Sequence, residues 1–187
     1  MKLSKFKIVY ASFLIAFFVI FLGFIFNNLH NKKINDALKE EYKVVTRKNI
    51  EYVPLEKRDS SIIYEVTSAD ISSIDNNKNT LLFFLTSWCP HCIEEIEDLK
   101  KAQVESSNVN YIIVSHDEKK EDLLRLLKDY DANFFVLWDP NRYIRTKLNS
   151  EDHTVPGAYL LDKEKNIIEI NKDTLTYNSI LDIVKGK

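Results

Sequence analysis

The chain has 187 residues, of which 45% are hydrophobic and 29% are charged, as in ordinary globular proteins. This length suits one domain with an appendage. The formal net charge is −2, so nothing in the charge balance predicts binding to nucleic acid or to anionic lipid.

The appendage lies at the N-terminus. Residues 1–7 form a lysine-rich tail, and residues 8–26 form an almost continuous apolar run. A run of about 20 apolar residues can cross a bilayer as a helix. A cleaved signal peptide is the alternative, but its apolar core is usually shorter and ends in small residues, which Phe24–Asn28 does not offer. We therefore expect an uncleaved transmembrane anchor at residues 8–26.

The tail predicts the orientation of this anchor. Under the positive-inside tendency, the short tail at residues 1–7 stays in the cytoplasm and the long C-terminal part lies outside. Lys32 and Lys33 on the other side of the run oppose this assignment. An extracytoplasmic location also suits a cysteine pair that acts on exported proteins.

Residues 27–48 are expected to form a linker or stalk between the anchor and the domain. Their apolar residues recur at helical spacing, which is compatible with a short helical stalk. A solvated linker explains the same composition, and both alternatives stay open. The pattern changes to short strand-like pieces after residue 48, so the domain is expected to cover residues 49–187.

The sequence of the domain predicts strands and helices in alternation. Strand-like pieces at 52–53 and 62–66 precede a turn-rich segment at 75–79. Further strands are expected at 81–85, 109–114 and 134–138, and helices from residue 92, at 118–130 and at 143–148. A hairpin at 158–162 and 167–170 and a helix at 177–184 close the chain. The sequence therefore predicts an α/β fold with a central mixed sheet covered by helices on both faces.

The two cysteines of the chain stand together as Cys89-Pro90-His91-Cys92. The predicted elements place Cys89 at a strand-to-helix turn, where unpaired N–H groups and the helix dipole favour a thiolate. A thiolate is the species that attacks a disulfide, so Cys89 is the predicted nucleophile. Cys92 lies one turn further on and would close on Cys89 to release a partner from a mixed disulfide.

The two residues between the cysteines have chemical roles of their own. Pro90 can occupy the first helical turn without the loss of a needed hydrogen bond. His91 can carry or donate a proton beside Cys89. We expect His91 to lower the pKa of the Cys89 thiol and to make the disulfide more oxidising.

Two plainer interpretations of the cysteine pair are weaker. A zinc site needs further ligands, and His30, His116 and His153 are scattered without the spacing that zinc uses. A purely structural disulfide between residues three apart closes a very short loop and stabilises little. The pair is therefore interpreted as a redox couple, with no metal.

Thr86 to Cys92 after an apolar strand, with Val155-Pro156 ahead of the predicted strand 158–161, resembles the thioredoxin superfamily. The segments 114–117, 135–140 and 155–162 look like the membrane-anchored, extracytoplasmic thioredoxin-like proteins of the TlpA and ResA type. The resemblance covers about residues 81–170. It implies a thioredoxin-like fold for the domain.

The resemblance also implies roles for individual residues. Cys89 would be the attacking thiol and Cys92 the resolving thiol, with Trp88 shielding the pair. Pro156 would be a cis proline beside the disulfide, and the exposed backbone of Val155 would pair with an extended substrate segment. An ordinary trans turn proline is the alternative. The resemblance implies no organic cofactor, since the redox-active disulfide does the chemistry.

Glu95 occupies the position at which ResA-like proteins carry an acidic residue that tunes the thiols. The alternative is a solvated helix charge among several acidic neighbours. Phe83 stands where thioredoxin carries a buried aspartate, so proton transfer would fall to Glu95, to a water or to His91. A peroxidase of the broader superfamily is not expected, because the pattern P-x-x-x-T-x-x-C is missing.

The sequence gives conflicting indications of the direction of electron flow. The scaffold resembles reductases, whereas the Pro90-His91 dipeptide and Val155 resemble the DsbA-type oxidases. We expect a membrane-tethered thiol:disulfide oxidoreductase that acts on cysteines of exported proteins, with oxidation slightly favoured, and that has a redox partner in the membrane. The alternatives are a dedicated reductase, for example of an apocytochrome, fed by a transmembrane electron donor, and a non-catalytic thioredoxin-like binding module.

Overall fold

The computed structural model describes residues 2–47, 52–53, 55–68, 71, 74, 77–150 and 154–186. The chain divides into two compact units, one comprising residues 1–40 and the other residues 41–187. The predicted boundary near Lys48 lies outside the described residues, as do two residues of the predicted turn, Asp75 and Asn76.

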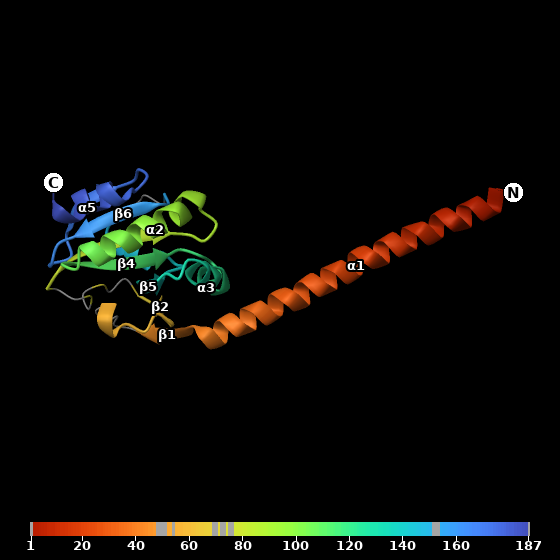
Figure 1. Cartoon of the computed structure of the whole chain (residues 1–187), viewed down its shortest axis with the longest axis horizontal. Helices are drawn as coiled ribbons and strands as arrows, with labels where there is room; N and C mark the ends of the chain where they lie inside the picture. Colours follow the sequence, from red (N-terminus) through yellow and green to blue (C-terminus); the bar gives the residue numbers. More distant parts are fainter. Residues whose placement is uncertain are drawn as a thin grey trace. The chain divides into compact units, whose positions relative to one another are not determined.

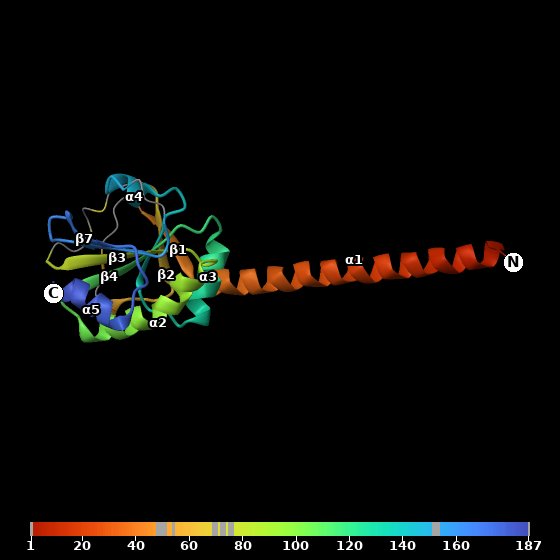
Figure 2. The same cartoon turned by 90° about the horizontal axis from the view of Figure 1, so that it is seen from above.

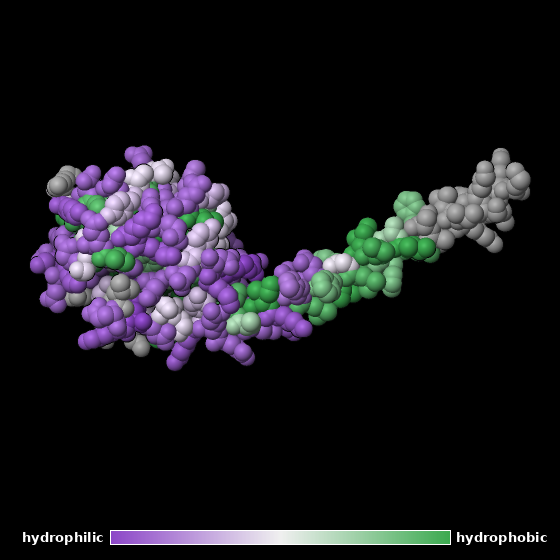
Figure 3. Space-filling view, in the orientation of Figure 1, coloured by the Kyte–Doolittle hydropathy of each residue, from purple (hydrophilic) through white to green (hydrophobic). Residues whose placement is uncertain are grey.

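The first unit is the helix α1 (Lys2–Glu41), drawn in red and orange in Figure 1. From Phe13 onward the helix is long and apolar enough to cross a membrane, and an 18-residue window of it has a mean hydropathy of 2.1. The large apolar side chains between Phe13 and Leu29 are exposed, and they form the green stretch in Figure 3. A helix that is apolar all round needs an apolar environment, so this one has the character of a membrane anchor.

In the described part of the chain, seven strands form one sheet in the order β1-β2-β5-β4-β3-β6-β7. The first five strands of this order run parallel to one another, β6 is antiparallel to β3, and β7 is antiparallel to β6, so the predicted mixed sheet is confirmed. The strands are β1 (Lys43–Arg47), β2 (Ile62–Val66), β3 (Asn79–Leu85), β4 (Val109–Ser115), β5 (Phe135–Trp138), β6 (Gly157–Leu161) and β7 (Ile167–Asn171).

The segment predicted as a linker contains structure of two kinds. Helix α1 continues to Glu41, as the helical alternative for the stalk requires. Residues 43–47 then form β1, which pairs with β2 at the edge of the sheet. The strand-like piece at Tyr52 and Val53 was a wrong prediction, because Val53 O accepts a hydrogen bond from Arg58 Nε at 2.9 Å and joins no strand ladder.

Helices cover both faces of the sheet, as predicted. They are α2 (Pro90–Glu105), α3 (Lys120–Asp129), α4 (Tyr143–Lys147) and α5 (Tyr177–Lys185), with a short 3₁₀ turn at Leu55–Lys57. Because β3, β4 and β5 are successive neighbours, right-handed crossovers place α2 and α3 on the same face. The chain then returns to β6 by way of α4, which Figure 2 shows on the side of the sheet opposite α2 and α5.

The residues buried in the core are the apolar runs and stripes from which the strands and helices were predicted. All seven residues of β4 are buried, as in a central strand with both faces covered. The four leucines of α3 (Leu123, Leu124, Leu126 and Leu127) are buried on one stripe. The central strands β3 and β4 are therefore rigid supports for the loops at their carboxyl ends.

Candidate active site

The cysteine pair lies at the carboxyl end of β3 and the start of α2. Cys89 and Cys92 form a disulfide with a Cα–Cα distance of 5.3 Å. Cys89 is the N-cap of α2, and its Sγ accepts a hydrogen bond from the Cys92 backbone N–H at 3.3 Å. Pro90 opens the first turn, as predicted. Cys89 is 5% exposed and Cys92 is fully buried, so Cys89 is the more exposed of the two cysteines.

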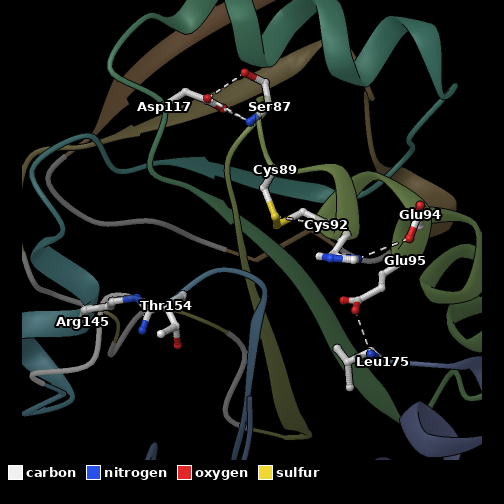
Figure 4. Close-up of a disulfide and its surroundings, with 10 residues drawn as sticks. Ser87, Cys89, Cys92, Glu94, Glu95, Asp117, Arg145, Thr154 and Leu175 are labelled. Atoms are coloured by element: carbon white, nitrogen blue, oxygen red, sulfur yellow. Dashed lines mark hydrogen bonds and ion pairs between the residues drawn. A yellow bond between two sulfur atoms is a disulfide. The ribbon is translucent and has the colours of Figure 1, made fainter. Parts of the chain in front are cut away.

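The loop between β3 and Cys89 is held by a buried carboxylate that the sequence analysis assigned no role. Asp117, just after β4, accepts hydrogen bonds from Ser87 N at 2.9 Å and from Ser87 Oγ at 2.7 Å. Figure 4 shows the contacts between Asp117 and Ser87. Asp117 also accepts a hydrogen bond from Ser115 Oγ at 2.7 Å. Strands β3 and β4 are parallel neighbours. Because the carboxyl ends of β3 and β4 lie side by side, an acidic residue soon after β4 could have predicted this contact from the sequence.

Glu95 is 2% exposed, so the alternative that it is a solvated helix charge is wrong. Its Oε1 accepts a hydrogen bond from Leu175 N at 2.8 Å, as Figure 4 shows. Its Oε2 has no hydrogen-bond partner among the described residues. Burial raises the pKa of Glu95 to about 7, although the Leu175 hydrogen bond and nearby His91 oppose this shift.

His91 and Trp88 flank the pair from the solvent side. The His91 side chain is 71% exposed, and its Nδ1 lies 3.5 Å from Glu94 Oε2. Trp88 is 73% exposed immediately before Cys89. The predicted effect of His91 on the Cys89 thiol and the predicted shielding by Trp88 stay predictions.

The loop before β6 reaches the same edge of the sheet. The Val155–Pro156 peptide bond is cis, as expected, and the alternative of a trans turn proline is wrong. The next residue, Gly157, pairs with Phe84 near the end of β3. Because β6 is antiparallel to β3, the start of β6 and the end of β3 meet, so Val155 and Cys89 leave the sheet at one edge. The pairing of Val155 with a substrate stays a prediction.

A buried arginine supports this loop. Arg145 of α4 is 1% exposed, and its Nη2 donates to Thr154 O at 2.7 Å. Its guanidinium lies 4.3 Å from the ring centre of Phe84, and its Nη1 donates to Tyr159 Oη at 3.3 Å. Sequence reasoning missed Arg145, because an arginine on a short helix reads as a surface residue.

The redox interpretation involves no metal. Within the described ranges, no group of three or more His, Cys, Asp or Glu side chains could hold a metal ion. His116 is buried against Phe84, with ring centres 5.4 Å apart, and His153 lies outside the described residues.

Phe83, which replaces the aspartate of thioredoxin, is buried in β3. With Phe83 at that position, the buried carboxyl group in the first turns of α2 is that of Glu95.

Comparison with known sequences finds matches over most of the domain. The model of the AhpC/TSA family matches residues 36–170. The thioredoxin-like protein YneN of Bacillus subtilis is 30% identical over 115 residues. That match covers 58% of this chain and 66% of the relative, so the chain spans just under two thirds of the relative's length.

Solved structures show the same fold at low identity. A DsbF homologue from Corynebacterium diphtheriae has a TM-score of 0.55 and 18% identity, over 59% of this chain and 73% of that one. StoA from Bacillus subtilis has a TM-score of 0.51 and 20% identity, over 57% and 81%. A thiol:disulfide interchange protein from Chlorobium tepidum has a TM-score of 0.54 and 19% identity, over 59% and 80%. The predicted thioredoxin-like fold is confirmed.

Proposed function

Because the chain belongs to the AhpC/TSA family and has the thioredoxin-like fold of thiol-disulfide oxidoreductases, we propose that it exchanges the Cys89–Cys92 disulfide with cysteines of exported proteins. One observation carries the proposal. The two cysteines form a disulfide at the N-terminus of α2, with Cys89 at its accessible end and Cys92 fully buried.

Exchange proceeds in two steps, each of which breaks one S–S bond and forms another. A substrate thiolate attacks Cys89 Sγ, which forms a mixed disulfide and releases Cys92 as a thiolate. A second substrate thiolate then attacks the substrate sulfur and releases Cys89 as a thiolate. Two electrons pass from the substrate to the pair, and the reverse sequence reduces a substrate disulfide. The Cys92 N–H at 3.3 Å and the start of α2 stabilise the Cys89 thiolate.

Glu95 is placed to handle the proton of the resolving thiol. It follows Cys92 by three residues on the buried side of α2, and its pKa of about 7 lets it exist in both protonation states near neutral pH. Cys92 has no exposure to water, so a buried carboxyl group nearby supports proton transfer there. His91 is the second group proposed for the proton of Cys89.

Oxidation of substrates is the proposed direction, because Pro90, His91 and Val155 resemble the residues of DsbA-type oxidases. One observation favours the opposite direction. Once ionised, the buried Glu95 carboxylate repels a thiolate, which stabilises the disulfide and lowers the reduction potential. A reductase fed by an electron donor in the membrane is therefore the second candidate.

The reduction potential of the full chain in detergent separates these directions. The chain is equilibrated in glutathione or dithiothreitol buffers, and the fraction of reduced Cys89–Cys92 is measured. A potential well above that of thioredoxin, about −270 mV, supports oxidation, and one at or below it supports reduction.

Trapping tests whether exchange occurs at all. In a Cys92→Ser chain, the Cys89 thiolate attacks a substrate disulfide and releases one substrate cysteine as a thiolate. Because the resolving thiol is missing, the mixed disulfide between Cys89 and the other substrate cysteine should accumulate. A Cys89→Ser chain is the matched control and should trap nothing. If neither variant traps a polypeptide and the native chain shows no turnover, the remaining interpretation is a non-catalytic binding module.

We also propose that α1 anchors the chain, with residues 1–7 in the cytoplasm and the thioredoxin-like unit outside the membrane. The lysines of the tail and the exposed apolar side chains of α1 support this orientation.

A further inference from the structure

We propose that Arg145 is a positioning residue for polypeptide substrates. It fixes the peptide group between Thr154 and Val155 in the orientation that presents the Val155 N–H to an incoming chain. This inference rests on the proposed thiol-disulfide exchange. It names a residue outside the reactive turn that favours polypeptides over small thiols.

The guanidinium of Arg145 lies inside the bend of the loop that leads into β6. Its Nη2 donates to Thr154 O at 2.7 Å. The same nitrogen occupies the space beside Gly157, where an added Cβ would lie 3.4 Å from Nη2 and 3.5 Å from Thr154 O. Val155 and Pro156 lie between these two contacts in the chain. The loop therefore bends around a guanidinium that belongs to a side chain with only 1% exposure.

The hydrogen bond to Thr154 O determines where the Val155 N–H points. The two groups belong to one trans peptide unit, which is planar and holds its C=O and N–H in opposite directions. Since the C=O points to the buried guanidinium, the N–H points away from it. Within the described ranges, Val155 forms no backbone hydrogen bond in a turn or loop, and it precedes the β6 ladder. Its N–H is therefore available to an extended chain at this edge of the sheet.

The side chain of Arg145 is held by residues of the two strands next to the loop. Its guanidinium carbon lies 4.3 Å from the ring centre of Phe84 in β3, and its Nη1 donates to Tyr159 Oη in β6 at 3.3 Å. Ser150 Oγ and Tyr159 Oη lie 2.8 Å apart, and the Ser150 N–H donates to Arg145 O at 3.1 Å. These contacts leave the guanidinium little freedom to turn away from the loop.

The helix that carries Arg145 is fixed at its start. Asp139 is fully buried, and its two carboxylate oxygens accept the N–H groups of Tyr143 and Ile144, each at 2.9 Å. The Asp139 N–H donates to Ser115 O at the end of β4, at 2.8 Å. Helix α4 is thereby attached to the central strands, so Arg145 holds the loop from a rigid base.

Packing alone does not account for an arginine at this position. The burial of a guanidinium costs free energy unless its N–H groups are hydrogen-bonded, and an apolar side chain of similar size would fill the space without that cost. Arginine offers several donors in a rigid, planar fork, which suits acceptors from different segments. Thr154 O and Tyr159 Oη are two such acceptors. The arginine therefore orients the loop as well as filling the space beneath it.

The test compares a substrate that can pair with the loop and one that cannot. The first is a peptide with one cysteine at its centre and several residues on each side. The second is dithiothreitol, which has no amide groups. The measured quantity is the ratio of the initial rates at which the two reduce the Cys89–Cys92 disulfide of the full chain in detergent. The variants are Arg145→Met, with an apolar side chain, and Arg145→Lys, which retains the charge but has one donor nitrogen.

Both variants are expected to lower the ratio of the peptide rate to the dithiothreitol rate by about three- to tenfold, the effect of one lost backbone hydrogen bond. Without the guanidinium, the peptide group before Val155 is free to rotate, and its N–H no longer meets the bound chain. Arg145→Lys provides the measurement if Arg145→Met does not fold.

Leu127→Ala is the control for a general loss of stability. Leu127 is buried in α3, and its truncation should destabilise the core by about 2–5 kcal/mol while the loop before β6 keeps its contacts. The ratio of the two rates should equal that of the native chain.

A ratio that is unchanged in the Arg145 variants, or that falls as far in Leu127→Ala, would overturn the assignment while exchange itself stands. Loss of folding in both Arg145 variants would also overturn it, since Arg145 would then serve the fold as a whole. A failure of the proposed function gives a different result. In that case the peptide does not reduce the disulfide of the native chain, although dithiothreitol does, and the positioning role fails with it.

Discussion

Only one of the two oxygens of the buried Glu95 side chain accepts a hydrogen bond among the described residues, and the charge of this side chain is therefore sensitive to pH. One oxygen accepts the Leu175 N–H at 2.8 Å, and the other has no partner among the described residues. A buried carboxyl group in this position is more stable when protonated, which is why its pKa rises to about 7 from its ordinary value of 4.5.

Glu95→Gln is expected to stabilise the oxidised protein at pH 8. The folded state binds the Glu95 proton more tightly than the unfolded state does. The stability from this proton is therefore complete below pH 4.5 and is lost as pH rises through 7. The variant should be about 1–3 kcal/mol more stable than the native chain at pH 8 and nearly equal to it at pH 4.5. Urea unfolding at both pH values measures this difference.

Glu97→Gln serves as the control for this prediction. Glu97 is on the same helix, 52% exposed and paired with Lys100 at 3.1 Å, so its replacement should leave the pH dependence unchanged. A stability difference that is the same at pH 4.5 and 8 would contradict the titration of Glu95.

The sequence predicted the role of some single residues but not the burial of others. Cys89 and Cys92 were predictable, because their spacing and the local strand-helix pattern suffice to define a redox pair. The burial of Glu95 was not, because Leu175, which lies 80 residues later in the chain, supplies its hydrogen bond. Arg145 is buried only because Phe84, Tyr159 and Thr154 from distant segments surround it.

At the scale of elements, the turn between β3 and α2 depends on a contact from the neighbouring strand. Asp117 fixes Ser87 through both the backbone N–H and the hydroxyl, and Ser87 is two residues before Cys89. The geometry of the reactive turn is therefore set jointly by β3 and β4.

Asp117→Asn is expected to destabilise the protein by about 1–3 kcal/mol. The amide can accept only through its single oxygen, so at least one donor among Ser87 and Ser115 is left unsatisfied in a buried position. Urea unfolding measures the change. Glu118→Gln, at the next and exposed position, should change stability by less than about 0.5 kcal/mol. An unchanged stability in Asp117→Asn would show that this contact does not hold the turn.

Elements with a strong local pattern were predicted closely, and β1 was not. The strands β3 to β7 and the helices α2 to α5 coincide with runs or stripes of apolar residues. The segment of β1 instead continues a helical spacing of apolar residues from α1. Its strand character comes from pairing with β2, a tertiary contact that a local pattern does not contain.

At the scale of the whole molecule, the proposed anchoring by α1 would set where the chemistry takes place. Its exposed apolar stretch is the segment that a bilayer would cover. A chain without residues 2–26 is expected to move from the membrane fraction to the soluble fraction.

Mass spectrometry of the mature chain checks this expectation against the signal-peptide alternative. An N-terminus at or near Met1, together with resistance to extraction from membranes by alkaline carbonate, agrees with an uncleaved anchor. A mature chain that begins after residue 26 would contradict it. Protease added to intact cells should degrade the thioredoxin-like unit, and protection of this unit would reverse the proposed orientation.

The burial of Cys92 has a consequence for the timing of the reaction. Cys92 is fully buried and Cys89 is only 5% exposed, so the fold leaves little of the pair open to an incoming sulfur. A cysteine inside a finished fold cannot make this approach, whereas one on an extended segment can. The protein would therefore select its clients by how far they have folded, and newly exported chains would react before their own cores close.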